Sequence, residues 1–215
     1  MKQYMLILFD FDYTLVDSSE GIVKCIKYAF DKIGEKNPND KEIKKLIGAP
    51  LEDVYMNLSD SPERKQYAKF KDYFMICSKK YMIDNVVIFN DTIDVLKEIK
   101  LRGMKIAIVS AKDSEMISKI ANKYGFAEYI DIIIGEDKVN NQKPDPEPVE
   151  SAIEKIGAKK GETLYIGDSL IDADTAEKAC VDFLPVVTGV TTEDMFKNFH
   201  KIGVMYQLRD VFNYI

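Results

Sequence analysis

The sequence predicts an α/β protein: a doubly wound parallel sheet with an all-helical segment inserted after the first strand. Two patterns lead to this prediction. Short apolar runs bounded by turn residues, which are typical of buried parallel strands, alternate along most of the chain with amphipathic helical patterns. One long interval near the N-terminus breaks this alternation and carries helical patterns only. Strands that alternate with helices favour right-handed crossovers and helices on both faces of one sheet.

The strands are expected where apolar residues run together without helical spacing. They are Met5–Phe9, Lys105–Val109, Ile130–Ile134, Thr163–Ile166 and Phe183–Val187. The helices that alternate with them are expected at Thr92–Arg102, Ser114–Tyr124 and Pro146–Ile156. A glycine directly follows each of these helices. Glycine is common at this position because it adopts the left-handed backbone conformation that ends many helices.

The interval from about Ser18 to Ile83 contains helical patterns and no convincing strand. One set of apolar residues shares a helical face: Ile22, Ile26, Ala29, Phe30 and Ile33. A second set steps by three and four: Tyr67, Phe70, Phe74, Cys77 and Tyr81. We interpret this aromatic stripe as a helix-packing face, with the lining of a substrate pocket as the alternative. We therefore expect an α/β core domain of residues 1–17 and 86–215 and a helical cap domain of residues 18–85.

The composition excludes several classes of protein. The 215-residue chain has a net charge of -6, and nothing suggests the basic face of a nucleic-acid-binding protein. No apolar run is long enough to span a membrane. The three cysteines form no C-x-x-C pair, which indicates apolar packing residues in a reducing compartment. We therefore expect a cytoplasmic protein, monomeric or a weak homodimer, without a nucleic-acid or membrane partner.

Polar residues follow the ends of several predicted strands. Ligands of open α/β sheets bind at the carboxyl ends of the strands, so residues at these points are expected to meet in one site. They are Asp10 and Asp12 after the first strand, Ser110 after the second, and Asp168 and Asp172 after the fourth, together with Lys143 in the loop before the helix at 146. Their convergence on one edge of the sheet is stronger evidence than any one of these residues alone.

The chemistry of these residues favours phosphoryl transfer. Clustered carboxylates need a counter-charge, and oxygen ligands suit Mg²⁺. The metal and Lys143 would neutralise a phosphate, so that Asp10 can attack phosphorus and form an aspartyl-phosphate. Ser110 can donate a hydrogen bond to a phosphoryl oxygen. Asp12 can protonate the leaving alcohol and then deprotonate the hydrolytic water.

Four segments resemble the motifs of the haloacid dehalogenase superfamily of phosphatases, in the order in which that family carries them. They are Asp10-Phe11-Asp12-Tyr13-Thr14-Leu15-Val16-Asp17-Ser18, Ile108-Val109-Ser110, Lys143-Pro144-Asp145-Pro146 and Gly167-Asp168-Ser169-Leu170-Ile171-Asp172. The resemblance covers nearly the whole chain and is strongest to the phosphoglycolate-phosphatase and β-phosphoglucomutase type. It implies a Rossmann-like sheet with a helical cap inserted after the first motif.

The resemblance also implies a role for each site residue. Asp10 is the nucleophile and Asp12 the acid/base, while Ser110 and Lys143 bind the phosphoryl group. Mg²⁺ would be bound by the side chains of Asp10 and Asp168 and by the backbone carbonyl of Asp12. Asp172 would orient the metal's water ligands or Lys143 rather than contact the metal.

The sequence departs from the family's usual pattern at three positions. Tyr13 stands where glycine is common, and it either narrows the substrate entrance or points away from it. The mutase type usually has a glutamate where Gly167 stands and an arginine near Leu51, so both differences favour a phosphatase. Residues 47–51 resemble the cap loop that meets substrate in this family, although a simple turn between helices is the alternative.

These observations predict a Mg²⁺-dependent phosphatase that acts on a small phosphorylated metabolite, as phosphoglycolate phosphatase does. A β-phosphoglucomutase-like mutase and an inorganic pyrophosphatase are the alternatives. A receiver domain would need no helical insertion, and a 2-haloacid dehalogenase would lack an acid/base at Asp12. Lys112 could contact the phosphate, and Lys44 and Lys45 could bind a second anionic group of the substrate or lie on a solvated face. The cap is expected to hinge near Asp17–Ser18 and Asn85–Val87.

Overall fold

The computed structural model describes residues 3–215, and a five-stranded sheet forms its centre. Every pairing in this sheet is parallel, and the strand order is β5-β4-β1-β6-β7. The strands are β1 (Leu6–Phe9), β4 (Lys105–Val109), β5 (Ile132–Ile134), β6 (Thr163–Gly167) and β7 (Asp182–Pro185). The sequence-based strands are therefore confirmed, with ends that differ by up to two residues. The doubly wound fold class is confirmed with them.

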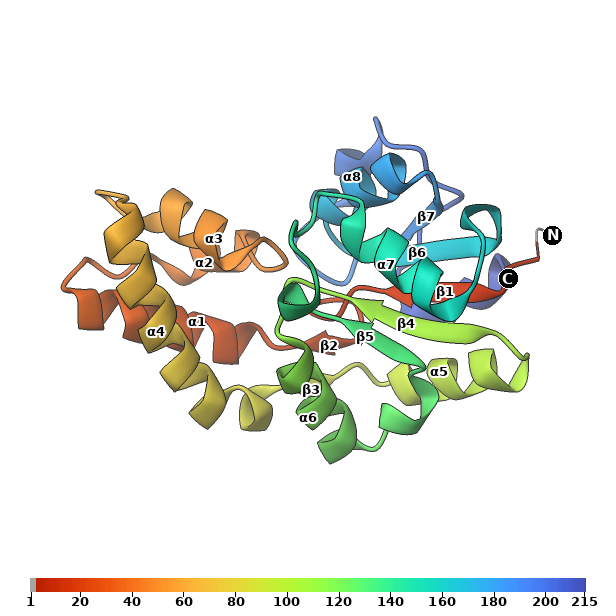
Figure 1. The fold of residues 1–215 in the computed structure, drawn as a ribbon, viewed down its shortest axis with the longest axis horizontal. Helices are drawn as coiled ribbons and strands as arrows, with labels where there is room; N and C mark the ends of the chain where they lie inside the picture. Colours follow the sequence, from red (N-terminus) through yellow and green to blue (C-terminus); the bar gives the residue numbers. More distant parts are fainter. Residues whose placement is uncertain (1–2) are drawn as a thin grey trace.

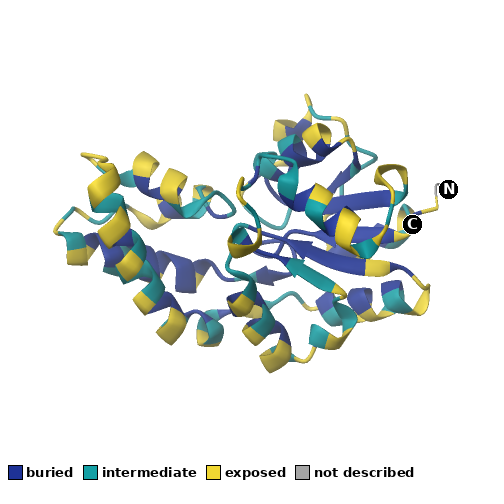
Figure 2. Cartoon of the chain, in the orientation of Figure 1, coloured by how far each residue is buried: buried dark blue, intermediate teal, exposed yellow. Residues whose placement is uncertain are grey.

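Both faces of the sheet are covered by helices, as Figure 1 shows. The helices α5 (Thr92–Leu101) and α6 (Ser114–Tyr124) cover one face, and α7 (Glu147–Ile156) and α8 (Leu170–Ala179) cover the other. Because both faces are buried, successive residues of a strand enter different cores. In β1, Ile7 and Phe9 join the core under α5 and α6, whereas Leu6 and Leu8 join the core under α7 and α8. The strands β1 and β6 are accordingly buried along their whole length, and β4 is buried from Ile106 onward (Figure 2). This burial explains why they appear in the sequence as apolar runs.

Four helices form a separate lobe beside the sheet. They are α1 (Ser19–Ile33), α2 (Asp40–Lys45), α3 (Leu51–Leu58) and α4 (Arg64–Tyr81). Aromatic rings hold this lobe together: the ring of Phe70 lies 5.1 Å from that of Phe30 and 5.2 Å from that of Tyr55. The aromatic stripe of α4 thus contributes to helix packing, and one of its members, Phe74, also lines a cavity.

A short ribbon joins the helical lobe to the sheet. It consists of β2 (Val16–Asp17) and β3 (Val87–Ile88), which pair in an antiparallel manner. The sequence does not predict this pair, because two-residue strands carry no periodic pattern. The predicted domain boundaries, after residues 17 and 85, fall at or beside this ribbon.

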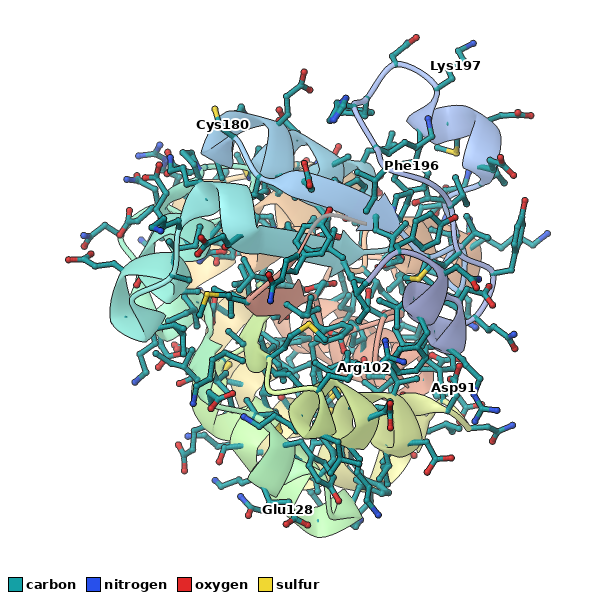
Figure 3. The ribbon with its side chains drawn as sticks, turned by 90° about the vertical axis from the view of Figure 1, so that its right-hand side faces the viewer. Asp91, Arg102, Glu128, Cys180, Phe196 and Lys197 are labelled. Carbon is teal, nitrogen blue, oxygen red and sulfur yellow. The ribbon has the colours of Figure 1, made fainter. Side chains whose placement is uncertain are left out.

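The segment after β7 packs along the edge of the core. Phe196 (Figure 3) is buried, and its ring lies 6.0 Å from that of Phe183. The guanidinium of Arg102, which directly follows α5, lies 4.5 Å from the ring centre of Phe212. Six short 3₁₀ helices complete the described chain: η1 (Ile83–Asn85), η2 (Ala127–Tyr129), η3 (Glu136–Lys138), η4 (Lys160–Glu162), η5 (Glu193–Phe196) and η6 (Leu208–Asn213). Within residues 3–215, no helix combines the length and apolar character needed to cross a membrane.

One prediction about the cysteines is wrong. Cys25 and Cys77 are buried, but Cys180 is exposed (Figure 3). Cys180 caps the C-terminus of α8 with a left-handed backbone, φ 56°. The buried face of that helix ends at Ala179, so the next side chain lies outside the core.

Candidate active site

The carboxyl ends of three neighbouring strands bring the predicted site residues together. Asp10 follows β1, Ser110 follows β4, and Asp168 follows β6, and these strands lie side by side in the sheet. All three side chains are buried despite being polar. Burying charged and polar groups is unfavourable unless they find partners, so their partners define what the site can do.

Lys143 is the central cation of the site. Its Nζ atom lies 2.8 Å from Asp10 Oδ1, 2.7 Å from Asp172 Oδ1 and 3.3 Å from the hydroxyl oxygen of Tyr165. Burial alone would lower the pKa of this ammonium group, but the carboxylates of Asp10 and Asp172 outweigh burial and raise it. Lys143 is therefore charged, and it fixes one oxygen of the candidate nucleophile Asp10.

Asp172 is held by a local sequence motif. Ser169-Leu170-Ile171-Asp172 forms a capping box at the start of α8, in which Asp172 Oδ2 accepts hydrogen bonds from the Ser169 backbone at 3.1 Å and hydroxyl at 2.6 Å. Its other oxygen, Oδ1, contacts Lys143 and accepts a hydrogen bond from the Tyr165 hydroxyl at 2.8 Å. Both oxygens are thus engaged by protein groups, which suits a residue that positions Lys143.

A cluster of carboxylates lies around Lys143. Ligand oxygens of Asp10, Asp168 and Asp172 all lie within 4.8 Å of one another. Burial raises the pKa of Asp10 to about 7, although the charge of Lys143 lowers it. Burial and the charges of Asp172 and Asp10 raise the pKa of Asp168 well above its usual value. When all three are ionised, one lysine leaves two negative charges uncompensated, which is the charge that one divalent cation balances.

The donor set fits Mg²⁺. The second oxygen of Asp10, Oδ2, is buried and accepts no hydrogen bond from the described residues. An unpartnered buried carboxylate oxygen is costly, so it is suited to a ligand that the protein does not itself supply. Oxygen-only ligands are those that hard cations prefer. The side chains of Asp10 and Asp168 are therefore the residues that would bind the metal.

Asp12 forms an ion pair with Lys112. Its Oδ2 atom lies 3.1 Å from Lys112 Nζ, and its Oδ1 accepts a hydrogen bond from the hydroxyl of Ser18. Lys112 is considered above as a contact of the phosphate. In the structure its ammonium forms an ion pair with Asp12. The backbone N–H of Lys112 also donates to Ser110 Oγ at 3.3 Å, so this residue joins the loop after β4 to the loop after β1.

Tyr13 takes the conformation that glycine would adopt. Its φ is 61°, in the left-handed region that non-glycine residues rarely occupy. Its carbonyl accepts a hydrogen bond from the hydroxyl of Thr188, and its side chain is buried within the apolar core. Tyr13 is not among the residues that line the cavity beside Asp12.

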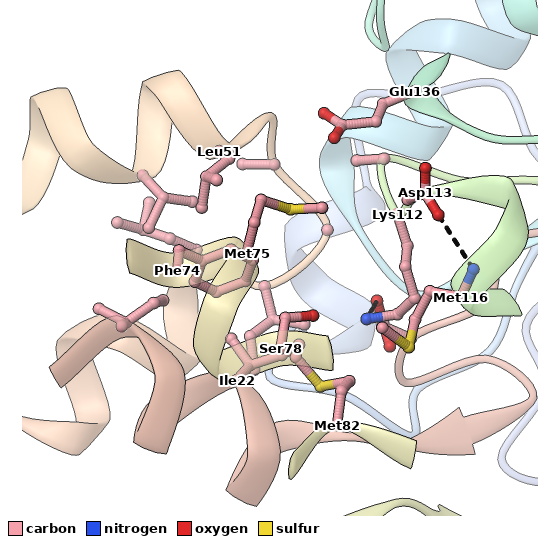
Figure 4. Close-up of a pocket in the computed structure, with 18 residues that line it drawn as sticks. Ile22, Leu51, Phe74, Met75, Ser78, Met82, Lys112, Asp113, Met116 and Glu136 are labelled. Atoms are coloured by element: carbon pink, nitrogen blue, oxygen red, sulfur yellow. Dashed lines mark hydrogen bonds and ion pairs between the residues drawn. The ribbon is translucent and has the colours of Figure 1, made fainter. Parts of the chain in front are cut away.

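That cavity lies between the helical lobe and the sheet, and Figure 4 shows its lining. It is bounded by α1, α4, the loop between α2 and α3, and the loop after β4. Residues 47–49 and Leu51 all line it. A Cβ added to Gly48 would lie 3.9 Å from Ser169 Oγ, an ordinary van der Waals distance, so this loop lies beside the start of α8. The loop predicted to meet substrate thus forms one wall beside the site.

Comparison with known proteins agrees with this geometry. A family model described as haloacid dehalogenase-like hydrolase matches residues 7–186. The chain belongs to the haloacid dehalogenase-like hydrolase family. A structure from Bacteroides fragilis, described as a haloacid dehalogenase-like hydrolase, matches this hydrolase with a TM-score of 0.94 and 36% identity over 97% of this chain and 100% of that chain.

Curated relatives of the hydrolase are similar along most of its length. Pyrophosphatase PpaX of Halalkalibacterium halodurans is 28% identical over 209 residues, which are 97% of this chain and 95% of that protein. A phosphoglycolate phosphatase of Aquifex aeolicus is 27% identical over 178 residues, 81% of this chain and 80% of that protein. The predicted superfamily and the predicted enzyme class, a phosphatase, are confirmed by these findings.

Several site residues of the hydrolase were not found from the sequence. Tyr165 lies within β6, where the sequence predicts only an apolar strand. Its hydroxyl nevertheless contacts both Lys143 and Asp172. Gly189 was not singled out, although an added Cβ there would lie 2.0 Å from Asp168 Oδ2. The sequence could have indicated Gly189, because a glycine that follows a strand end in such a sheet often marks a close approach of the backbone to another group.

Proposed function

We propose that this enzyme is a Mg²⁺-dependent phosphatase that hydrolyses a small-molecule phosphate monoester through an aspartyl-phosphate on Asp10. One observation carries the proposal: the buried Asp10 carboxylate is fixed through Oδ1 by Lys143, while Oδ2 accepts no hydrogen bond from the described residues. A carboxylate held in this way at a strand end is oriented for nucleophilic attack and for metal binding.

The first half of the reaction forms the covalent intermediate. A carboxylate oxygen of Asp10 attacks phosphorus, and the bond between phosphorus and the leaving oxygen breaks. Asp12 donates its proton to that oxygen, so the product leaves as a neutral alcohol. Bound Mg²⁺ supplies positive charge that offsets the repulsion between carboxylate and phosphate. Lys143 and the Ser110 hydroxyl stabilise the phosphoryl oxygens.

The second half regenerates the enzyme. Water attacks the phosphorus of the aspartyl-phosphate, its proton passes to Asp12, and the Asp10 carboxylate leaves as inorganic phosphate forms. Lys112 and Ser18 hold the two oxygens of Asp12 and so set the position from which it exchanges its proton. Cap closure about the β2–β3 ribbon would exclude bulk water before attack.

A sugar-phosphate mutase is supported less well by the site. The mutase type resembled by this sequence usually carries a glutamate in place of Gly167. A Cβ at residue 167 would lie 2.5 Å from Asp172 Cγ, so no side chain can stand there unless Asp172 moves. Phosphoglycolate and inorganic pyrophosphate enter as candidate substrates because relatives carry these names.

The cellular setting follows from the charge and the cysteines. We expect a cytoplasmic enzyme, because its described cysteines are all unpaired thiols. Its net charge of -6 does not favour nucleic acid. A monomer or weak homodimer is expected, and analytical ultracentrifugation tests this expectation.

The test is phosphate release from a panel of small phosphate esters, with Mg²⁺ and with EDTA. The Asp10→Asn variant should lose turnover by at least about 10³-fold, since the nucleophile is removed. Asp174→Asn is the matched control, because Asp174 makes only a surface ion pair with Lys178. Turnover of Asp10→Asn equal to wild type would exclude the aspartyl-phosphate mechanism.

A further inference from the structure

The cavity beside Asp12 has an apolar lining. It lies against the proposed acid/base, and Asp10 and Asp168 are not among the residues that line it. It is therefore placed to hold the group that leaves rather than the phosphoryl group. Most of its wall consists of hydrocarbon and thioether side chains, which include Leu51, Phe74, Met75, Met82 and Met116 (Figure 4).

The charges around this cavity do not suit an anionic leaving group. Lys112 is the only cation among the described residues that line it, and its ammonium already contacts Asp12 at 3.1 Å. Lys44 and Lys45, considered above as contacts of a second anionic group, are absent from its lining. The remaining charged residues of the wall are carboxylates, Asp113 and Glu136.

Both of these carboxylates already contact other groups of the protein, and neither is paired with a cation that lines the cavity. Asp113 accepts a hydrogen bond from the Met116 backbone at 3.0 Å and caps α6. Glu136 accepts a hydrogen bond from Gln142 at 3.2 Å and lies 4.0 Å from the ammonium of the half-exposed Lys71. A carboxylate or second phosphate on the leaving group would thus lose its hydration, and it would have to compete with Asp12 for Lys112, which is unfavourable.

We infer that the preferred substrate is a phosphate monoester of a short, uncharged, largely hydrocarbon alcohol. Its leaving oxygen lies at Asp12 and its hydrocarbon part occupies the apolar cavity. The cavity volume is about 80 Å³. It therefore has room for about six non-hydrogen atoms, at about 10–15 Å³ for each water-sized group. This inference rests on the proposed phosphatase activity, and it ranks such esters above phosphoglycolate and pyrophosphate.

A series of n-alkyl phosphates from methyl to pentyl tests the inference. These alcohols are similar leaving groups, so differences in kcat/KM report binding of the chain. We expect kcat/KM to rise about fourfold per methylene, the factor that corresponds to about 0.8 kcal/mol per buried CH₂. Pentyl phosphate should exceed phosphoglycolate and pyrophosphate by at least about tenfold, since each of these carries an unpaired charge.

A charge introduced into the wall should invert the ranking. Met75→Lys places an ammonium group in the cavity, so it should lower kcat/KM for pentyl phosphate by about tenfold or more and raise it for phosphoglycolate. Ile76→Lys is the matched control: it adds the same charge one residue along α4, at a side chain that is 58% exposed and outside the cavity. Circular dichroism confirms that both variants fold.

The outcomes separate the inference from the function on which it rests. A flat alkyl series, or faster hydrolysis of phosphoglycolate or pyrophosphate by wild type, would overturn the apolar leaving group and leave the phosphatase intact. The absence of phosphate release from every ester, p-nitrophenyl phosphate included, would overturn the proposed function and the inference with it. An equal effect of Met75→Lys and Ile76→Lys would show that the cavity does not bind the leaving group.

Discussion

Replacing Tyr165 with phenylalanine removes a single hydroxyl from beneath the active site. That hydroxyl donates to Asp172 Oδ1 at 2.8 Å and lies 3.3 Å from Lys143 Nζ. Asp172 is fully buried and depends on such donors for its stability. The change adds no bulk and no charge, so its effect reports the hydrogen bond itself.

The size of the effect follows from the type of partner. A hydrogen bond to a charged group contributes about 1.5–3 kcal/mol, and one between neutral groups about 0.5–1.5 kcal/mol. We therefore expect Tyr165→Phe to lower the free energy of unfolding by about 2 kcal/mol. In a protein of this length, each kcal/mol shifts Tm by about 2–4 °C, so Tm should fall by about 4–8 °C.

Urea unfolding followed by circular dichroism measures this loss, with EDTA present to keep the metal out of the comparison. Tyr124→Phe is the matched control, because its hydroxyl donates to a neutral backbone carbonyl, that of Val86, at 3.0 Å. It should cost about 1 kcal/mol. A Tyr165→Phe loss no larger than that of Tyr124→Phe would refute the view that this hydroxyl stabilises an ionised Asp172.

Four further predictions concern the metal and the acid/base. Because burial raises the folded-state pKa of Asp10 from 3.8 to about 7, the metal-free folded enzyme holds a proton that the unfolded chain has lost. Its stability should therefore fall as pH rises from about 4 to about 7 and then level off. Mg²⁺ needs the ionised carboxylate, so it should raise Tm more at pH 8 than at pH 5, and an equal rise at both would contradict the site. Lys112→Met removes the cation that orients the acid/base carboxylate, and kcat should fall about tenfold with little change in the Mg²⁺ dependence; an unchanged kcat would argue against this role. Gly189→Ala pushes a methyl group against Asp168 and should weaken Mg²⁺ binding about tenfold or more by calorimetry, whereas Gly161→Ala, which meets no atom within 4 Å, should not.

The sheet and the position of the site could be predicted because both depend on local patterns. Residues Ile106–Val109 of β4 are buried on both faces of the sheet, so they appear as an unbroken apolar run that ends at a polar residue, Ser110. The rule that ligands bind at the carboxyl ends of strands then directs attention to Asp10, Ser110 and Asp168 without any knowledge of the tertiary structure.

What the sequence did not predict depends on contacts between distant segments. The pair of Asp12 and Lys112 joins residues of two different strand-end loops, and neither residue type specifies the other. Tyr165 lies in an apolar strand, where a tyrosine is most simply interpreted as a core residue. The apolar character of the cavity arises from side chains of both the helical lobe and the sheet, and their juxtaposition exists only in the folded chain.

The antiparallel ribbon of β2 and β3 is the point at which the chain both enters and leaves the helical lobe. Asp17 and Val87 are paired neighbours in that ribbon, so the chain leaves the sheet and returns to it at one point. A two-residue Asn-Gly turn is the usual way to close such a pair into a hairpin. A shortened chain built in this way would keep the carboxylates and lysine at the sheet edge and would lose the wall that faces the leaving group. The fold thus places the carboxylates and Lys143 on the sheet side and most of the cavity wall on the helical side, with the chain crossing between them at one ribbon.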